Sequence, residues 1–157
     1  MEVKFAFDLS RLWEHSVKNK SFGIVSAYKP ELTKDENERR SELLKEYVRK
    51  DLGYGYQEIY GVWKSPDGTV TIEYPLFIPY LTRDHAVFLG RDLHLPNPED
   101  RHPQDRIVVG DTREILLIDP TTDIIYEHWT HLEVGWRELW EGEKGTGWSE
   151  YKKNPWR

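Results

Sequence analysis

The sequence predicts an α+β fold, with a mainly antiparallel sheet and two principal helices on one face. Two observations predict the helices, because Thr33 and Thr82 each stand as a capping residue before a segment with apolar residues at helical spacing. A third predicts the sheet, because short apolar runs are joined by tight turns, which favour antiparallel hairpins. The predicted order is strand, helix, two strands, helix, and then two or three strands.

The first two segments precede the first helix. Residues 3–15 fit both a short strand and a helical turn, because their apolar residues match either periodicity. Residues 21–30, SFGIVSAYKP, predict a strand, since Phe22, Ile24 and Val25 favour β structure and the final proline ends it.

The first helix has the clearest signals. Thr33 and Glu36 form a capping box, in which each side chain bonds to the backbone of the other residue. Residues 43–48 place apolar side chains at helical spacing, and Gly53 suits the left-handed conformation that ends many helices. We therefore predict a helix that begins after Thr33 and ends at Gly53.

Residues 56–81 predict a hairpin. The turn SPDG, residues 65–68, has proline and glycine where a tight turn favours them. In the second arm Val70, Ile72 and Tyr74 alternate with other residues, which indicates one buried face.

The second helix and the last strands follow. Thr82 caps the helix, and Leu81 and Ala86 occupy the positions of a hydrophobic staple. Residues 95–104 contain three prolines and predict a loop. The runs DRIVVG and REILLID predict two strands, and a turn leads into IIYEHWTHLEV as a third.

Composition restricts the classes of function. The chain has 157 residues, 32% of them charged, and a formal net charge of -6. Such an acidic chain is a poor general binder of nucleic acid, which needs clustered Lys and Arg. The lack of cysteine excludes a disulfide framework and a thiolate nucleophile, and it suits a reducing cytosol. Without a long apolar stretch or a basic, apolar leader, we expect a cytoplasmic protein that does not span a membrane.

Asn37 and Arg40 lie on the same helical face as Leu44 and Tyr47, where the core stripe continues. Together with the backbone N–H groups of the first turn, Arg40 predicts an anion site for phosphate or carboxylate. The alternative is structural: Arg40 pairs with a carboxylate such as Glu73, and Asn37 satisfies loop backbone.

Aromatic residues cluster just after this helix, at Tyr54, Tyr56, Tyr60 and Trp63. They suit stacking on a base or ring, with hydroxyl groups left to orient it, and they equally suit packing in the core. The binding hypothesis joins Tyr54, Tyr56 and Trp63 to the predicted anion site and adds Glu73 as an orienting carboxylate.

Few residues suggest catalysis. His128 and Thr130 match half of a two-histidine phosphoesterase signature, which needs two such motifs facing one phosphate. The sequence has no second copy, so both are weak catalytic candidates. Asp100, His102 and Asp105 could ligate a cation, but a solvated acidic loop is far commoner. We therefore favour a non-enzymatic protein without a metal or cofactor.

The chain divides by composition near residue 135. We expect residues 1–135 to form a single α+β domain and residues 136–157 to form a Trp-rich C-terminal arm. Tryptophan is enriched at interface hot spots, so the arm either mediates a homodimer or higher oligomer or folds back on its own domain. Its tryptophans are Trp136, Trp140, Trp148 and Trp156.

Residues 22–118 resemble a family of small bacterial and phage proteins of uncharacterised function. The resemblance rests on SAY, on ENERR at the start of the first helix, on GYGY at its end, on GVW in the next strand and on EYPLFIP. AVFLGRDL and DRIVVG add to it. It implies a compact α+β domain of phage or mobile-element origin and assigns no catalytic residue. The residues that match its pattern are Asn37, Arg40, Gly53, Tyr54, Gly61 and Trp63.

These features predict a small phage- or mobile-element-type binding protein that sequesters a nucleotide-like phosphorylated ligand, in a role such as counter-defence. The counter-defence step rests on analogy with other phage proteins. Two alternatives stay open. One is a protein inhibitor that blocks a host enzyme through its acidic, Trp-rich surface. The other is a phosphodiesterase that uses His128 and Thr130.

Overall fold

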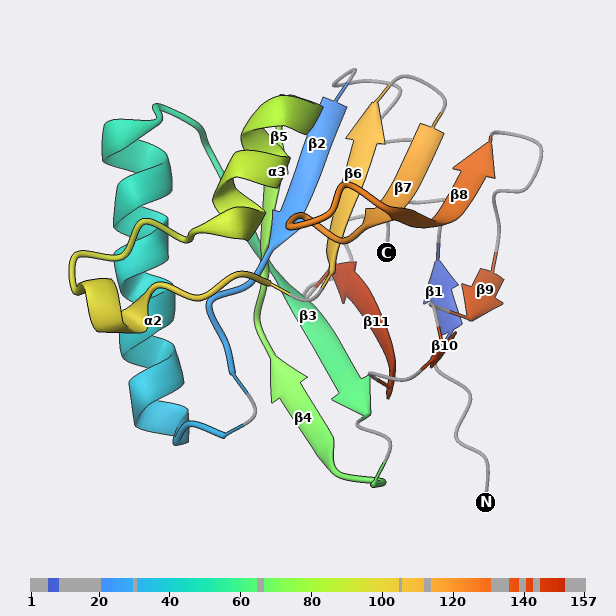
Figure 1. The fold of residues 1–157 in the computed structure, drawn as a ribbon, viewed down its shortest axis with the longest axis horizontal. Helices are drawn as coiled ribbons and strands as arrows, with labels where there is room; N and C mark the ends of the chain where they lie inside the picture. The colour runs from blue at the N-terminus through green and yellow to red at the C-terminus, as the bar shows by residue number, and fades with distance from the viewer. Residues whose placement is uncertain are drawn as a thin grey trace.

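A computed structural model gives the structure of the chain. It describes residues 6–8, 21–29, 31–64, 67–104, 106–111, 114–130, 136–138, 141–142 and 145–151. This part of the chain has the predicted α+β fold, with an antiparallel sheet and two helices (Figure 1).

The described strands form one large sheet and one small sheet, and their pairings are antiparallel. In the large sheet the order is β10-β11-β3-β5-β2-β6-β7-β8, and β4 also pairs with β3. The small sheet joins β1 to β9. The strands are β1 (Ala6–Asp8), β2 (Ser21–Val25), β3 (Gln57–Lys64), β4 (Val70–Glu73), β5 (Leu76–Pro79), β6 (Ile107–Asp111), β7 (Glu114–Ile118), β8 (Ile125–Thr130), β9 (Trp136–Glu138), β10 (Glu141–Gly142) and β11 (Gly145–Tyr151).

Two helices, α2 (Lys34–Glu46) and α3 (Arg83–Arg91), begin at the predicted caps. In each, the threonine hydroxyl accepts a hydrogen bond of 3.2 Å from the backbone N–H three residues further along. A short 3-10 turn, η2 (Pro98–Asp100), lies in the predicted proline-containing loop. Within the described residues, no helix is long and apolar enough to cross a membrane.

A π-helical turn, η1 (Tyr47–Asp51), extends α2, and the sequence did not predict it. The backbone N–H of Leu52 donates to the carbonyl of Tyr47, five residues back, at 3.1 Å. Gly53 follows with a φ of 75°, a conformation that glycine adopts without strain. The helix therefore ends where the glycine predicted, but through a wider last turn.

The predicted hairpin is confirmed, with an interruption in its second arm. β3 and β4 pair as expected, with Gly61 opposite Glu73. The second arm is interrupted at Pro75 and resumes as β5, which pairs with β3 in the same register, with Phe77 opposite Gln57, and with β2 on its other edge. Proline has no N–H for the ladder, while its carbonyl still accepts a bond of 2.9 Å from Ile59. The break leaves Glu73 at the end of β4.

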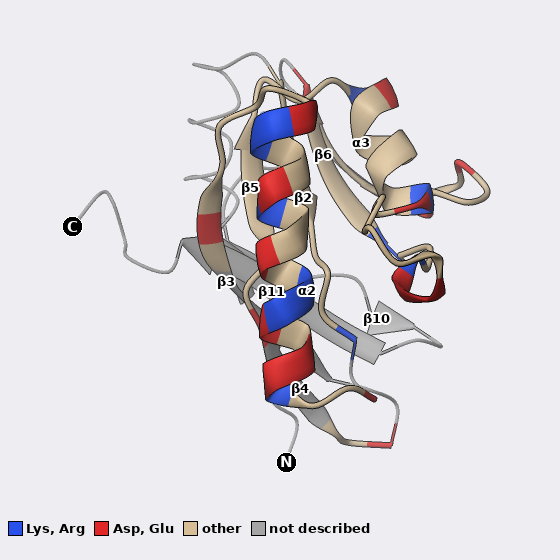
Figure 2. Cartoon of the chain, turned by 90° about the vertical axis from the view of Figure 1, so that its left-hand side faces the viewer, with Lys and Arg blue, Asp and Glu red and all other residues tan. Residues whose placement is uncertain are grey.

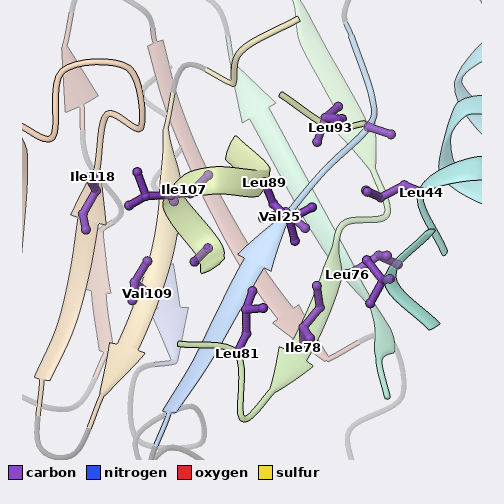
Figure 3. Packing of buried hydrophobic residues seen from close by; sticks show 14 of the residues in the cluster. Val25, Leu44, Leu76, Ile78, Leu81, Leu89, Leu93, Ile107, Val109 and Ile118 are labelled. Carbon is purple, nitrogen blue, oxygen red and sulfur yellow. The ribbon is translucent and has the colours of Figure 1, made fainter. Parts of the chain in front are cut away.

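The core between the helices and the sheet collects side chains from both (Figure 3). On the opposite face of the sheet, Phe22, Phe77, Ile115 and Leu117 are buried as well. Both faces of the central strands are therefore covered. This explains why β6 and β7 are nearly continuous apolar runs, since an antiparallel sheet with one solvated face would alternate.

The C-terminal arm contributes strands to the sheets of its own chain. β11 pairs with β3 from Thr146 opposite Lys64 to Tyr151 opposite Ile59, and β9 pairs with β1. Trp136 lies in β9 and Trp148 in β11, but their side chains are outside the described part. Trp140 and Trp156 lie outside the described residues altogether. An interface role for the four tryptophans stays a prediction.

Candidate ligand-binding site

Asn37 holds the segment that joins β2 to α2, residues 26–32, called here the β2–α2 loop. Its amide oxygen accepts a hydrogen bond of 2.9 Å from the N–H of Lys29. Its amide nitrogen donates to the carbonyls of Lys29, at 3.0 Å, and Leu32, at 3.5 Å. The side chain is buried, so its polar atoms serve loop backbone, as the structural alternative expects.

Arg40 is 1% exposed and joins the β2–α2 loop to η2. Its Nε donates to the carbonyl of Ala27 at 2.9 Å, and its Nη1 donates to the carbonyl of Asp100 at 2.8 Å. The carboxylate of Asp100 lies 3.4 Å from Nη1, so the partner of Arg40 is Asp100 and not Glu73. Burial lowers the pKa of the guanidinium, and Asp100 opposes this. Nη2 is buried without a partner, so the network is incomplete.

Glu73 reaches the same loop from the end of β4. Its Oε2 accepts a hydrogen bond of 3.3 Å from the hydroxyl of Ser26, and that hydroxyl accepts one of 3.1 Å from the N–H of Tyr28. Gln104 fixes the backbone of Ser26 on both sides, accepting from its N–H at 3.2 Å and donating to its carbonyl at 2.6 Å. The hydroxyl that binds the Glu73 carboxyl thus belongs to a residue whose backbone Gln104 holds in place.

The carboxyl of Glu73 is poorly solvated. Its residue keeps partial solvent exposure. The surrounding protein desolvates the charged form strongly enough to raise the pKa of Glu73 to about 7, and the hydrogen bond from Ser26 opposes this only in part. A carboxyl that changes charge near neutral pH is typical of functional sites.

Tyr28 and Tyr74 lie beside the hydrogen-bonded pair of Ser26 and Glu73. The rings of Tyr28 and Tyr74 meet edge to face with centroids 6.3 Å apart, and both residues are partly exposed. Burial, with the charges of Glu38 and Glu58, raises the pKa of Tyr28. We define the candidate site as Ser26, Tyr28, Glu73 and Tyr74. It offers ring surfaces, a hydroxyl and a carboxyl in acidic surroundings.

The aromatic residues predicted to join Arg40 lie elsewhere. Tyr54 and Tyr56 follow η1, at the opposite end of α2 from Asn37, and pack partly buried against the core. The Tyr54 hydroxyl lies 2.7 Å from Nδ1 of His85. Trp63 lies in β3 opposite Thr71, and its side chain is outside the described part. The structure therefore brings Asn37, Arg40 and Glu73 to one loop and places Tyr54 and Tyr56 apart from it.

The weak catalytic candidates lie on the edge of the sheet away from α2 (Figure 1). His128 in β8 has its Nε2 3.3 Å from the carboxylate of Glu114, and the Thr130 side chain is not described. Among the described residues, no group of three acidic, histidine or cysteine side chains is placed to hold a metal ion. Asp100 contacts Arg39 and Arg40, and Asp105 lies outside the described residues.

Ser26, Tyr28, Tyr74 and Gln104 were not predicted as site residues. SAY and EYP signalled three of them, but only as part of the resemblance. Gln104 lies 78 residues from its partner Ser26, and no sequence pattern reports such a contact.

We expect Glu73→Gln to stabilise the protein at pH 8 by about 2 kcal/mol and to have a smaller effect at pH 5. The folded pKa of about 7 lies above the ordinary 4.5, so folding favours the protonated carboxyl. Its contribution to stability is full below pH 4.5 and is lost as the pH rises to about 7. Urea unfolding at the two pH values measures the difference. Glu36→Gln at an exposed site is the matched control, and an equal gain there would contradict the prediction.

Comparison of the chain with protein-family models and with curated proteins gave no match.

Proposed function

We propose that this chain is a binding protein that sequesters a nucleotide-like ligand and recognises its base through Glu73. One observation carries the proposal: in the partly exposed residue Glu73, the carboxyl has a pKa of about 7 and accepts a hydrogen bond from Ser26. Such a group binds a ligand according to its protonation state.

The carboxyl favours a base edge with adjacent donors. When Glu73 ionises, Ser26 supplies one hydrogen bond, which leaves a poorly solvated charge. A guanine-type edge presents two neighbouring N–H groups, which a carboxylate accepts together as charge-assisted bonds. Ligand binding would then stabilise the ionised form and lower the pKa of the carboxyl.

The two tyrosine rings support a planar ligand. Tyr28 and Tyr74 are partly exposed next to Glu73, and aromatic side chains contribute stacking of about 1 to 3 kcal/mol per base. The acidic neighbours Glu38 and Glu58 disfavour a phosphate beside these rings. Arg40 is 1% exposed, and its Nε and Nη1 donate to Ala27 and Asp100, so we place the phosphate toward solvent and assign recognition to the base.

The biological role rests on the resemblance to phage and bacterial proteins stated above. We propose sequestration, in which the ligand is held and returned unchanged, with counter-defence as the setting. An enzyme that used His128 and Thr130 would return product instead, and His128→Ala would then abolish turnover.

The test is a thermal-shift panel of the ribonucleoside 5′-monophosphates at pH 6 and pH 8. We expect the guanine nucleotide to bind about tenfold more tightly at pH 8, because the ionised fraction of Glu73 grows by that factor. At 100 times its dissociation constant, a ligand stabilises the protein by about 2.7 kcal/mol. Glu73→Gln should remove the pH dependence and weaken binding.

Two controls make the panel decisive. Glu36→Gln, at the exposed start of α2, removes the same charge and should leave binding unchanged. Mass spectrometry of the ligand released by denaturation should find it intact. Absence of any nucleotide-induced rise in melting temperature at pH 8 would reject the site. A Glu73→Gln variant that binds the guanine nucleotide as tightly as the parent protein would also reject it.

A further inference from the structure

The rings of Tyr28 and Tyr74 form a corner beside Glu73. Their planes stand at 78° with centroids 6.3 Å apart, so the edge of one ring meets the face of the other. Both residues are partly exposed. A flat ligand that stacks on one ring of such a corner presents its own edge to the face of the other ring. Because the face of an aromatic ring is negative, the corner favours a ligand with a positive edge.

The charges that act on the Tyr28 hydroxyl are mainly negative. Burial raises the pKa of Tyr28 most, the charges of Glu38 and Glu58 raise it further, and the opposing effect of Lys45 is the smallest. Figure 2 shows acidic residues on α2 and on β3, the two elements that the ion pair of Lys45 with Glu58 joins. The electrostatic field at this ring therefore favours a positively charged ligand.

Lys45 does not reverse the sign of this field, because two carboxylates hold it. Its Nζ lies 2.6 Å from Glu58 and 2.8 Å from Glu42. Burial opposes the charge of Lys45, yet the hydrogen bonds to Glu42 and Glu58 raise its pKa above the ordinary value. Two carboxylates thus surround one ammonium group, and the cluster carries a net negative charge. Lys34 lies 3.9 Å from Glu38 but is largely exposed, so solvent screens this pair.

Glu73 adds a further carboxylate that no cation neutralises. Among the described residues, Glu73 forms no ion pair, and its carboxyl accepts one hydrogen bond, from Ser26. An ionised carboxylate in a poorly solvated place is stabilised by a ligand that brings both N–H donors and positive charge. The rings and the carboxylates therefore favour the same kind of ligand, a flat cation.

We infer that the ligand is a nucleotide whose guanine base is alkylated at N7 and therefore carries a positive charge. The inference rests on the proposed function, because it keeps Glu73 as the group that binds the base. Alkylation at N7 leaves the N1–H and N2–H groups free for the carboxylate, and the positive charge makes both groups stronger donors. The same charge strengthens the contact with the two tyrosine rings. Unmodified guanine offers the hydrogen bonds without the charge.

The test compares three nucleotides by isothermal titration calorimetry. They are guanosine 5′-monophosphate, its 7-methyl derivative and 7-methyl-7-deazaguanosine 5′-monophosphate. The last keeps the methyl group but has carbon in place of N7, so its base is neutral. We expect the 7-methyl nucleotide to bind at least about fivefold more tightly than either of the others. The titrations are made at pH 7, because alkylation makes N1–H more acidic and this proton has to stay on the base.

Variants assign the preference for the charged base to this site. Tyr28→Leu should reduce the preference for the 7-methyl nucleotide over its neutral counterpart to less than about twofold, because one ring of the corner is lost. Glu38→Gln should reduce the preference by about twofold, since this exposed charge is partly screened. Glu36→Gln removes the same charge from the same helix at a residue that does not act on Tyr28, so it should leave the preference unchanged.

The outcomes separate this inference from the proposed function. Equal affinity for the 7-methyl nucleotide and its neutral counterpart, with binding of both weakened in Glu73→Gln, would overturn the inference and leave the proposed function standing. Absence of binding by all three nucleotides would overturn both. A preference for the charged base that Tyr28→Leu leaves unchanged would also overturn the inference, because the charge would then be recognised elsewhere on the protein.

Discussion

Gly110→Ala is expected to lower the free energy of unfolding by about 3 kcal/mol, because β6 has no space for a methyl group at this position. A Cβ there would lie 1.9 Å from Cε1 of Phe22 on the neighbouring strand β2. The Phe22 ring cannot move aside, since it is fully buried and stacks on Phe77 with centroids 4.9 Å apart. Urea unfolding followed by tryptophan fluorescence measures the change.

Gly55→Ala is the matched control for this prediction. A Cβ at Gly55 meets no atom within 4 Å, so the same substitution should change stability by less than about 0.5 kcal/mol. Equal midpoints for the two variants would mean that Phe22 does not cover Gly110, and the β2–β6 register would then be wrong.

Arg40→Met is expected to cost about 3 kcal/mol, the lower end of the range for breaking a buried ion pair. The change removes the donors that satisfy the carbonyls of Ala27 and Asp100, and methionine retains the apolar volume. We favour the lower end because the Asp100 side chain is 19% exposed and keeps Arg39 as a partner at 3.2 Å.

Arg39→Met tests the same carboxylate from an exposed position. The Arg39 side chain is 54% exposed, so losing its pair with Asp100 should cost less than about 1 kcal/mol. If Arg40→Met proved as mild as Arg39→Met yet abolished nucleotide binding, Arg40 would be a ligand residue, as the sequence first suggested, and the recognition site would have to be moved.

Local signals predicted the elements well. Thr33 and Thr82 begin the two helices because their hydroxyls bind backbone N–H groups three residues away, which a short pattern can report. The π-helical turn and the break at Pro75 were missed because tertiary contacts decide them. β5 pairs with β3 on one edge and with β2 on the other, and periodicity carries no information on the second pairing.

The candidate site was predictable only in part. The helical face singled out Asn37 and Arg40 correctly as polar residues in buried positions, but it could not say what they bind. What Arg40 binds depends on Asp100, which lies 60 residues away in the sequence. Glu73 was predicted as an orienting carboxylate, whereas its raised pKa depends on packing around the β2–α2 loop that no single sequence reveals.

The most direct test of the proposed site is a ¹³C NMR titration of the Glu73 carboxyl carbon, with and without guanosine 5′-monophosphate. We expect a midpoint near pH 7 in the free protein and a lower midpoint with the nucleotide, which binds the ionised carboxylate. A midpoint near 4.5 in the free protein, or one that saturating nucleotide leaves unchanged, would contradict the assignment of Glu73 as the group that recognises the base.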